Sequence, residues 1–494
     1  METQRPDIEE DNIVLLTDSY KISHWKQDPP GTQNMYSYFE SRGGIFPETQ
    51  FFGLQYQLKK WFVGTVVTKD KIDFADYVLR EHFGNPNVFN RKGWEHILNH
   101  HDGKLPLSIR AVPEGTVVPT KNVLITCEST DPNTFWLPGY TNSLLTQNWY
   151  PTKVATFSMN MKKLLLNSLE RTGNPANIDF MLHDFGFRGT ECVESARIGA
   201  AAHLLNFKGT DTLPGIVALM KYYNAGVSGF SVPAAEHETI TSWGKDREPE
   251  AVENILNQFP TGVVSVVSDS YDIYKACREI WGERLRDRVL GRDGVVVVRP
   301  DSGEPEKIVV EVLEILGEKF GTSINQKGYK VLPPQIRVIQ GDGINYESTD
   351  RILKALEKAG WSADNLVLGM GGALLQNHNR DDLKFAFKCS SVTIDGVEHD
   401  VYKQPITDIG KASKAGRLKL ILRNGEFSTV RESMLGKDQL VEVFRNGRVT
   451  VDQNLDEIRE RALTGFLKIM RRGTPDSVLI QNRERMKMRD IVAN

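Results

Sequence analysis

The chain contains 494 residues, of which 25% are charged, and its formal net charge is −3. A chain of this length exceeds one simple core, so we expect either two domains or one elaborated barrel. The near balance of charge, without a basic block, argues against nucleic-acid binding as the main role, and no apolar stretch reaches membrane-spanning length.

The four cysteines are far apart in the sequence, at Cys127, Cys192, Cys277 and Cys389. None forms a C-x-x-C pair, so their spacing indicates neither a zinc site nor a disulfide framework. Residues 1–12 are polar and acidic, unlike a signal peptide. A reducing compartment fits this pattern, and we expect a cytoplasmic location.

The two ends of the chain indicate mixed α and β structure. Tyr36–Glu40 has strand character and Leu54–Phe62 has helix character. Beyond Phe385 the pattern becomes antiparallel, because Asp395-Gly396 separates two short strand-like runs as in a hairpin. We predict a discontinuous α+β domain of residues 1–150 plus 385–494, and a second domain of residues 151–384.

The middle of the chain alternates between apolar runs and amphipathic helical sequence. VVVVRPDSG (295–303), IRVIQGDG (336–343) and LVLGMGG (366–372) each begin as a strand buried on both faces and end in a loop rich in glycine or aspartate. Further strands are expected at 178–182, 230–232 and 263–267, with helices at 233–243, 271–281, 304–320 and 346–359. This rhythm predicts parallel strands in an irregular (β/α) barrel, an α/β fold whose post-strand loops share one rim.

The rim loops have the residue types that bind a phosphorylated sugar. Glycine allows backbone N–H groups to approach an anion, and aspartate holds Mg²⁺ or ribose hydroxyls. A lone glycine cluster can equally be a tight turn. The sequence 369–372 is no dinucleotide fingerprint, since Leu374 replaces the third glycine, and no G-x-x-x-x-G-K-[ST] motif occurs.

Four other short motifs carry candidate residues, each with a structural alternative. In LHDFGFRG (182–189), Arg188 is suited to clamp phosphate, whereas Phe185 reads equally well as core. Asp211 ends the loop NFKGTD (206–211), and His237 lies in the first turn of the predicted helix 233–243; capping or solvated roles are common at such positions. VVSDSYD (266–272) brings polar side chains to a strand end, where capping is again the default.

Nine motifs in this order resemble the nicotinamide phosphoribosyltransferase family, from about Asn12 to about Asp456. They are LLTDSYK (15–21), SYFESR (37–42), LHDFGFRG, NFKGTDT (206–212), SVPAAEH (231–237), SVVSDSYD (265–272), RPDSG (299–303), VIQGDG (338–343) and LLQNHNRD (374–381). The resemblance implies transfer of phosphoribose from phosphoribosyl pyrophosphate to nicotinamide. It also implies a homodimer with shared active sites, Mg²⁺, and ATP as a coupling substrate that is not strictly required.

The resemblance also assigns roles to residues of this sequence. Phe185 and the partner subunit's Tyr20 would sandwich the pyridine, Asp211 would accept from the carboxamide NH₂, and Arg299 and Ser268 would complete the base site. The catalytic residues would be His237, Asp301 and Arg299, with His237 phosphorylated by ATP. The residues that would bind the diphosphate are Arg42, Arg188, His237, Lys403 and Lys411. Those that would bind ribose and the 5′-phosphate are Asp301, Gly341, Asp342, Gly371, Gly372, Arg380 and Lys388. Asp272 and Asp301 would hold the metal. Asp18, Tyr20, Arg42, Arg380 and Lys388 would come from the partner side.

Two other functions remain open. A nicotinate phosphoribosyltransferase shares the sugar-phosphate residues and differs in base recognition, but a carboxylate at Asp211 would repel nicotinate. A non-catalytic scaffold of the same fold is disfavoured by the joint presence of Arg188, His237, Arg299 and Asp301. One departure from the family is Ala386, which stands where relatives commonly offer a serine hydroxyl to the 5′-phosphate.

Overall fold

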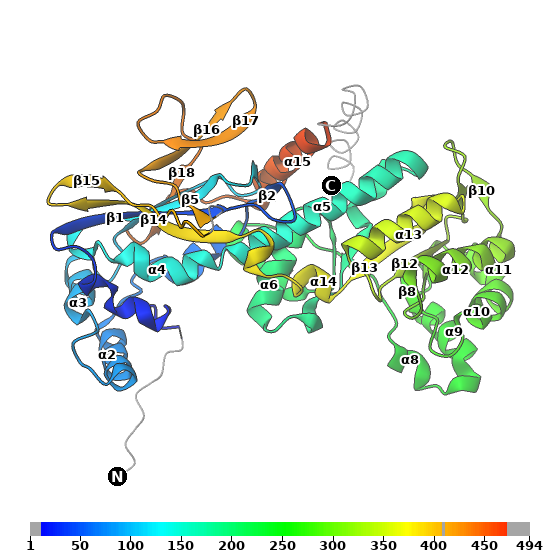
Figure 1. Ribbon diagram of the computed structural model, residues 1–494. Coiled ribbons are helices and arrows are strands. Elements are labelled where there is room, and N and C mark those ends of the chain that lie inside the picture. The colour runs from blue at the N-terminus through cyan, green and yellow to red at the C-terminus, as the bar shows by residue number, and fades with distance from the viewer. Residues whose placement is uncertain (1–10, 408–410, 472–494) are drawn as a thin grey trace, which may run out of the picture. The chain divides into compact units, whose positions relative to one another are not determined.

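The computed structural model describes residues 11–407 and 411–471 (Figure 1). They form two compact units. Unit 1 contains the described residues up to Thr156, together with Met220–Ala225 and Asn379–Gly465; unit 2 contains Phe157–Leu219, Gly226–His378 and the described residues from Phe466. The charged, partly amphipathic sequence 479–490, which is typical of a surface helix or a tail, lies outside the described residues.

Unit 1 is built on a seven-stranded antiparallel sheet that joins the two ends of the chain. Its strand order is β15-β14-β1-β5-β3-β18-β19, so strands from the C-terminal part flank those from the N-terminal part on both sides. The bounds are β1 Thr32–Ser41, β3 Leu107–Ala111, β5 Val123–Ser129, β14 Phe385–Ile394, β15 Val397–Asp400, β18 Val441–Arg445 and β19 Arg448–Val449. The sheet confirms the predicted fold class, with a second α+β domain that is discontinuous in sequence; the bounds 1–150 plus 385–494 stay a prediction, and unit 1 also includes Met220–Ala225. The hairpin is also confirmed, because Asp395 and Gly396 both have positive φ (48° and 79°) between β14 and β15.

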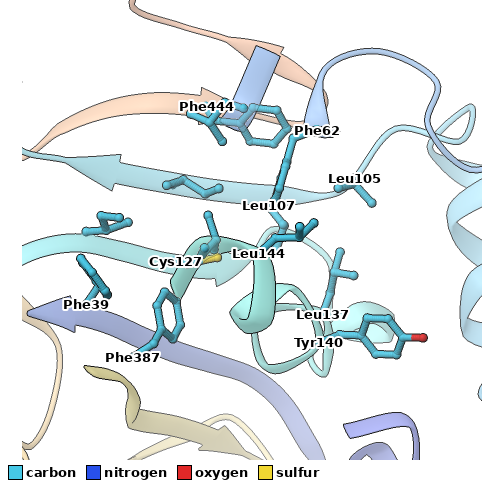
Figure 2. Packing of buried hydrophobic residues seen from close by; sticks show 14 of the residues in the cluster. Phe39, Phe62, Leu105, Leu107, Cys127, Leu137, Tyr140, Leu144, Phe387 and Phe444 are labelled. Carbon is cyan, nitrogen blue, oxygen red and sulfur yellow. The ribbon is translucent and has the colours of Figure 1, made fainter. Parts of the chain in front are cut away.

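The core of unit 1 lies against this sheet (Figure 2). Phe39 of β1 stacks on Phe385 of β14, with ring centroids 5.3 Å apart, and Phe62 meets Phe444 of β18 edge to face at 5.9 Å. Leu137 and Leu144 of helix α4 (Leu137–Thr146) are buried in the same cluster. Burial of such side chains, at roughly 1.5–3 kcal/mol each, holds the two distant chain segments together.

Helices and short strands complete unit 1. Helix α3 (Arg91–His100) begins where the Asn90 side chain accepts from the Gly93 N–H, and α2 (Lys69–Phe83) where Thr68 accepts from the Lys71 N–H. The helix expected over 54–62 is present as α1 (Leu54–Gln57) continued by a π-helical turn, Leu58–Phe62. Two 3₁₀ helices cover Ser19–Lys26 and Pro132–Thr134, and the short strands are β2 Glu48–Gln50, β4 Val117–Pro119, β16 Leu418–Arg423 and β17 Glu426–Arg431. Helices α5 (Trp149–Thr172) and α15 (Leu455–Arg471) begin in unit 1 and continue into unit 2.

Unit 2 contains a curled, fully parallel six-stranded sheet, ordered β7-β6-β13-β12-β9-β8. The bounds are β6 Leu182–Asp184, β7 Gly209–Thr210, β8 Gly262–Val267, β9 Gly294–Arg299, β12 Ile336–Gln340 and β13 Leu366–Met370. Phe230 bridges Gly209 at one edge and Ala234 bridges Ser265 at the other, so one extended segment links both edge strands. This linkage confirms the irregular barrel, in which α12 packs on β12 and α13 packs on α12 (both labelled in Figure 1).

The helices of unit 2 follow their strands closely. The α-helices are α6 Val193–His203, α7 Leu213–Tyr223, α8 His237–Thr241, α9 Glu248–Gln258, α10 Ile273–Lys275, α11 Arg286–Leu290, α12 Pro305–Phe320, α13 Tyr346–Lys358 and α14 Gly372–Leu375. The last residues of α7 belong to unit 1. Strands β10 (Ser323–Ile324) and β11 (Lys330–Val331) pair as a small hairpin. Among the described residues, no helix has the length and apolarity needed to cross a membrane.

Four predicted elements of unit 2 differ from the structure. The strand expected at 230–232 is only an isolated bridge at Phe230. The strand expected at 178–182 is a 3₁₀ helix, Pro175–Phe180, because Asn174 caps it and Pro175 begins it; the strand starts at Leu182. The helix expected from Pro233 starts at His237, since the Pro233 carbonyl accepts from the Ser265 N–H and stays extended. The helix expected over 271–281 passes from α10 into a π-helical stretch, Ala276–Arg284.

Candidate active site

Most of the predicted site residues of unit 2 lie at the carboxyl ends of the parallel strands. Phe185 follows β6, Asp211 follows β7, Arg299 ends β9, and Gly341 and Gly371 follow β12 and β13. Parallel strands place these loops at one rim, where ligands of α/β folds bind. The loops expected to form one site are therefore neighbours.

The Phe185 ring packs against two glycines. A Cβ on Gly369 would lie 2.0 Å from the Phe185 ring, and one on Gly341 would lie 3.4 Å from it. Below the ring, the buried Asp184 carboxylate accepts from the Gly186 N–H (2.7 Å) and the Thr210 hydroxyl (2.8 Å), which fixes the turn after β6. The aromatic face is thus held in place by its neighbours, as an aromatic base site requires.

The Asp211 carboxylate lies beside His183 and Ser231. The His183 Nε2 is 2.7 Å from Asp211 Oδ1, and the Ser231 hydroxyl donates to the same oxygen. Burial alone would raise the pKa of the Asp211 carboxyl, but the contact with His183, the Ser231 hydrogen bond and the charge of Arg299 outweigh burial and lower it. Asp211 is therefore a carboxylate at neutral pH, suited to accept from an N–H donor.

His237, Asp301 and Asp269 form a second group on the rim. His237 Nε2 lies 3.4 Å from Asp301 Oδ2 and 3.8 Å from Asp269 Oδ1, while its Nδ1 lies 3.1 Å from the Ser270 hydroxyl oxygen. Asp269 Oδ2 accepts from the Asp301 N–H (3.0 Å) and from the Ser302 hydroxyl (2.5 Å). The buried Asp269 Oδ1 has no hydrogen-bond partner among the described residues, so it is oriented for a cation or a donor.

The sequence assignments did not include Asp269, and its neighbours Asp272 and Ser268, which they did include, make contacts of their own; the roles assigned to these two stay predictions. Asp272, expected at the metal, is exposed and caps α10 by accepting from the Lys275 N–H at 3.0 Å. Ser268, expected at the base, is buried, and its hydroxyl donates to the Val266 carbonyl (2.9 Å) and accepts from the Trp281 indole (3.0 Å). The motif VVSDSYD had drawn attention to this strand end, but only the fold distinguishes its carboxylates.

Arg299 reaches toward the same carboxylates. Its Nη2 lies 3.7 Å from Asp301 Oδ2, and its buried Nε has no hydrogen-bond partner among the described residues. Arg188, in the turn after β6, is exposed and pairs with Glu236 at 2.8 Å. These guanidinium groups have donors directed at the rim, which suits an amide oxygen or an anion.

The glycines in the loops after β12 and β13 leave free space beside the backbone at the rim. A Cβ on Gly341 would be 3.3 Å from Asp301 Oδ1, so this glycine keeps the loop close to that carboxylate. Gly371 and Gly372 border the start of α14 with no atom closer than 3.7 Å to an added Cβ. In the other loop, Asp342 follows Gly341 and is exposed, and Gly343 after it is in the left-handed region at φ 67°. This space is compatible with a phosphate near backbone N–H groups.

Unit 1 holds the other predicted site residues, which form a cationic cluster. Burial, followed by the charges of Arg42, Lys403, Arg380 and Lys21, lowers the pKa of the Lys388 ammonium. The Arg42 Nη1 donates to the Lys411 carbonyl (3.4 Å), whereas its buried Nη2 has no hydrogen-bond partner among the described residues. Arg42 also pairs with Glu40 at 3.3 Å, and the collected positive charge is suited to attract phosphate groups.

Tyr20 is on the surface of unit 1 in the 3₁₀ helix that begins at Ser19. Its ring is 62% exposed and meets His24 edge to face at 5.2 Å. The preceding Asp18 accepts from Ser143 (2.5 Å) and pairs with Lys21 (3.1 Å). An exposed aromatic on a segment anchored in this way is available to another molecule.

Two solved structures share the fold. A nicotinate-nucleotide pyrophosphorylase from Pyrococcus furiosus matches with a TM-score of 0.59 at 15% identity, covering 94% of this chain and 97% of that one. Human nicotinic acid phosphoribosyltransferase matches with a TM-score of 0.53 at 16% identity, covering 92% and 94%. At such low identity the likeness concerns the fold alone.

Sequence comparison gives the family. Residues 180–448 match the nicotinate phosphoribosyltransferase (NAPRTase) family and residues 12–109 match the nicotinamide phosphoribosyltransferase N-terminal domain. A nicotinamide phosphoribosyltransferase of Xanthomonas campestris pv. campestris (strain 8004) is 50% identical over 465 residues, covering 92% of this chain and 98% of that protein. Another, from Acinetobacter baylyi, is 32% identical and covers 91% and 97%. With the rim residues and these matches together, the chain belongs to the nicotinamide phosphoribosyltransferase family of enzymes.

Proposed function

We propose that the chain joins nicotinamide to phosphoribosyl pyrophosphate, giving nicotinamide mononucleotide and pyrophosphate in NAD salvage. The observation that carries this choice of base is the Asp211 carboxylate, which stays ionised and lies near the Arg299 charge. Nicotinamide offers an NH₂ donor to such a carboxylate and a carbonyl acceptor to a guanidinium. Nicotinate offers a second negative charge in place of the donor.

In the proposed reaction the pyridine nitrogen attacks C1 of ribose, and the C1–O bond to pyrophosphate breaks with its electrons leaving on pyrophosphate. The ring nitrogen then carries the positive charge. The face of Phe185 attracts that charge only as it develops, so this contact favours the transition state. No proton leaves the attacking nitrogen, so no general base is needed for bond formation.

The leaving diphosphate requires cations and the ribose requires fixed hydroxyls. We assign Arg188 to the diphosphate, Asp301 and Asp342 to ribose hydroxyls, and Gly371 and Gly372 to the 5′-phosphate. Asp269 and Asp301 fit Mg²⁺, because both are carboxylates on one rim and Asp269 Oδ1 lacks a partner among the described residues. The ion would neutralise charge on the diphosphate.

We propose that the active protein is a homodimer in which unit 1 of each subunit serves the rim of the other. The cationic side chains gathered around Lys388 and the 62% exposure of Tyr20 support this arrangement, because phosphates need cations and an exposed ring is available to a second chain. Arg42, Arg380, Lys388, Lys403 and Lys411 would then meet phosphates, and the partner subunit's Tyr20 would cover the pyridine.

We also propose that ATP phosphorylates His237. The γ-phosphate would pass to an imidazole nitrogen with release of ADP, and water would later remove the phosphate. The proximity of Asp269 and Asp301 to Nε2 supports this role, because a carboxylate orients an imidazole for such a transfer. All four cysteines are free thiols, which supports a reducing compartment, and we propose the cytoplasm.

Initial rates with nicotinamide and with nicotinate, each with phosphoribosyl pyrophosphate and Mg²⁺, test the proposal. Nicotinamide mononucleotide and pyrophosphate should form in equal amounts, and nicotinate should react at least a hundred-fold less efficiently. Preferred use of nicotinate would assign the chain to the other base, and no turnover of either base would refute a catalytic role.

A further inference from the structure

Two histidines and one aspartate converge on one point in unit 1. His96 Nε2 lies 2.6 Å and His101 Nε2 lies 2.7 Å from the same oxygen, Oδ2 of Asp131. All three side chains are partly buried, at 22%, 23% and 15% exposure. None of the three is among the residues assigned to nicotinamide, ribose, phosphates or Mg²⁺.

The fold fixes each of these side chains separately. His96 lies in the last turns of α3, and His101 is the residue that caps its C-terminus, where the chain leaves the helix and turns Nε2 back. Asp131 Oδ1 accepts from the Asn133 N–H (2.8 Å) and the Asn133 side-chain amide (3.0 Å) as the cap of Pro132–Thr134. The second oxygen, Oδ2, is thereby directed at the imidazoles, and the capping contact acts as outer-shell support.

We propose that His96, His101 and Asp131 bind one divalent transition-metal ion, of which Zn²⁺ is the representative. Two imidazole nitrogens and one carboxylate oxygen are ligands that Zn²⁺ and its first-row neighbours prefer, whereas Mg²⁺ prefers oxygen alone. The ligand atoms all lie within 4.8 Å of one another. The partial exposure leaves room for water to complete the coordination.

The geometry needs only a small adjustment to accept the ion. Metal–ligand distances of about 2.0–2.1 Å in a tetrahedral site separate neighbouring ligand atoms by roughly 3.3 Å. The nitrogen–oxygen distances of 2.6 and 2.7 Å would therefore open by about 0.6–0.7 Å. His101 caps the C-terminus of α3, where the helix dipole favours a cation.

Nearby residues offer matched controls. His100 stacks on His96 with centroids 4.3 Å apart, but its Nδ1 faces the His96 carbonyl at 3.3 Å, so it is no ligand in this arrangement. Cys192 has an exposed thiol that could take up Zn²⁺ independently, and it lies in unit 2. Asp131→Asn keeps an oxygen that can cap Pro132–Thr134 while removing the charge.

The experiment measures Zn²⁺ binding to the chelator-treated, untagged full-length chain by competition with a chromophoric indicator, in millimolar Mg²⁺. Cys192→Ser serves as the background. One Zn²⁺ per chain should bind, and Asp131→Asn and His101→Gln should each weaken binding at least ten-fold, while His100→Ala should leave it unchanged. Co²⁺ should give absorption bands of a nitrogen- and oxygen-ligated ion that vanish in His101→Gln.

The contrary result is equally clear. If the chain does not bind one Zn²⁺, the proposal is wrong and the three residues form only a His–Asp–His hydrogen-bonded group. Binding that survives both Asp131→Asn and His101→Gln would place the ion elsewhere. Catalytic turnover does not decide the question, because kcat/KM for nicotinamide should be equal in the background and in all three variants.

Discussion

The Asp269 carboxylate accepts a hydrogen bond from the Asp301 backbone N–H at 3.0 Å, which ties the loop after β9 to the end of β8. Its other oxygen is buried, lies 3.8 Å from His237 and has no hydrogen-bond partner among the described residues. One side chain thus holds the loop that carries a proposed ribose ligand and also faces the proposed phosphate-coupling histidine.

Asp269→Ala should therefore lower kcat/KM at least a hundred-fold, because it removes both the loop anchor and a carboxylate proposed for Mg²⁺. The comparison is with Asp272→Ala, which removes an exposed cap of α10 worth about 1 kcal/mol and the other carboxylate that follows β8. Steady-state kinetics compares kcat/KM of the two variants, and thermal unfolding checks that both are folded. Equal losses of activity would show that Asp269 has no privileged role.

Gly369→Ala should disturb the base site through Phe185. The added Cβ would lie 2.0 Å from the ring, so the ring must move or the strand must shift. We expect the KM for nicotinamide to rise at least ten-fold, with a smaller change in the KM for phosphoribosyl pyrophosphate. Gly226→Ala, where an added Cβ meets no atom within 4 Å, is the control. Unchanged nicotinamide kinetics in a folded Gly369→Ala variant would contradict a pyridine site at Phe185.

The parallel core was predictable because its strands are buried on both faces and therefore read as unbroken apolar runs. The sequence could not distinguish Asp269 from Asp272, because both follow β8, and only the course of the chain directs one to Asp301 and the other to the Lys275 N–H. The bond between Ser268 and the Trp281 indole was likewise not predictable, since it depends on helical packing. The group formed by His96, His101 and Asp131 was not predicted either, because Asp131 lies 30 residues beyond His101 in the sequence.

A shared active site predicts recovery of activity on mixing two inactive variants. Tyr20→Ala and Phe185→Ala homodimers each lack one proposed ring at both sites, whereas a mixed dimer has one site with both rings. Co-refolded or co-expressed chains should regain up to about a quarter of wild-type activity, as half of the dimers are mixed and each has one intact site. The control is a mixture of either variant with itself. Confirmed subunit exchange without recovery would exclude the shared site.

His237→Ala should separate ATP hydrolysis from synthesis. The imidazole is proposed to receive phosphate, and the pyridine nitrogen has no proton for it to remove. ATPase activity and ATP stimulation should disappear, while ATP-independent formation of nicotinamide mononucleotide continues at a reduced rate. Ser270→Ala, which removes only the contact at Nδ1, should retain ATPase activity. Undiminished ATP hydrolysis in His237→Ala would assign the phosphate acceptor to another residue.

Asp211→Asn should reduce the preference for nicotinamide. The variant keeps the shape, removes the charge and adds a donor, so nicotinamide loses a charge-assisted bond of about 1.5–3 kcal/mol and nicotinate loses a repulsive neighbour. Each 1.4 kcal/mol is about ten-fold, so the ratio of the two kcat/KM values should fall by one to two orders of magnitude. Steady-state kinetics of both proteins with both bases provides the measurement, and Asp342→Asn, a second exposed rim carboxylate, is the control for a general charge effect.

The pH dependence of that ratio follows from the direction of the Asp211 pKa. Burial opposes ionisation, but His183, Ser231 and Arg299 outweigh burial, so the folded-state pKa lies below its ordinary value of 3.8. Because the folded-state pKa is lowered, the Asp211 charge is fully present above the ordinary carboxyl pKa, and so is any stability that its contacts contribute. Both are lost only as the pH falls through the lower pKa of the folded state. The wild-type preference for nicotinamide should therefore persist from about pH 8 to about pH 5. A preference that declines between pH 7 and pH 5 in wild type, but not in Asp211→Asn, would show that Asp211 takes up a proton in that range and would overturn the assignment.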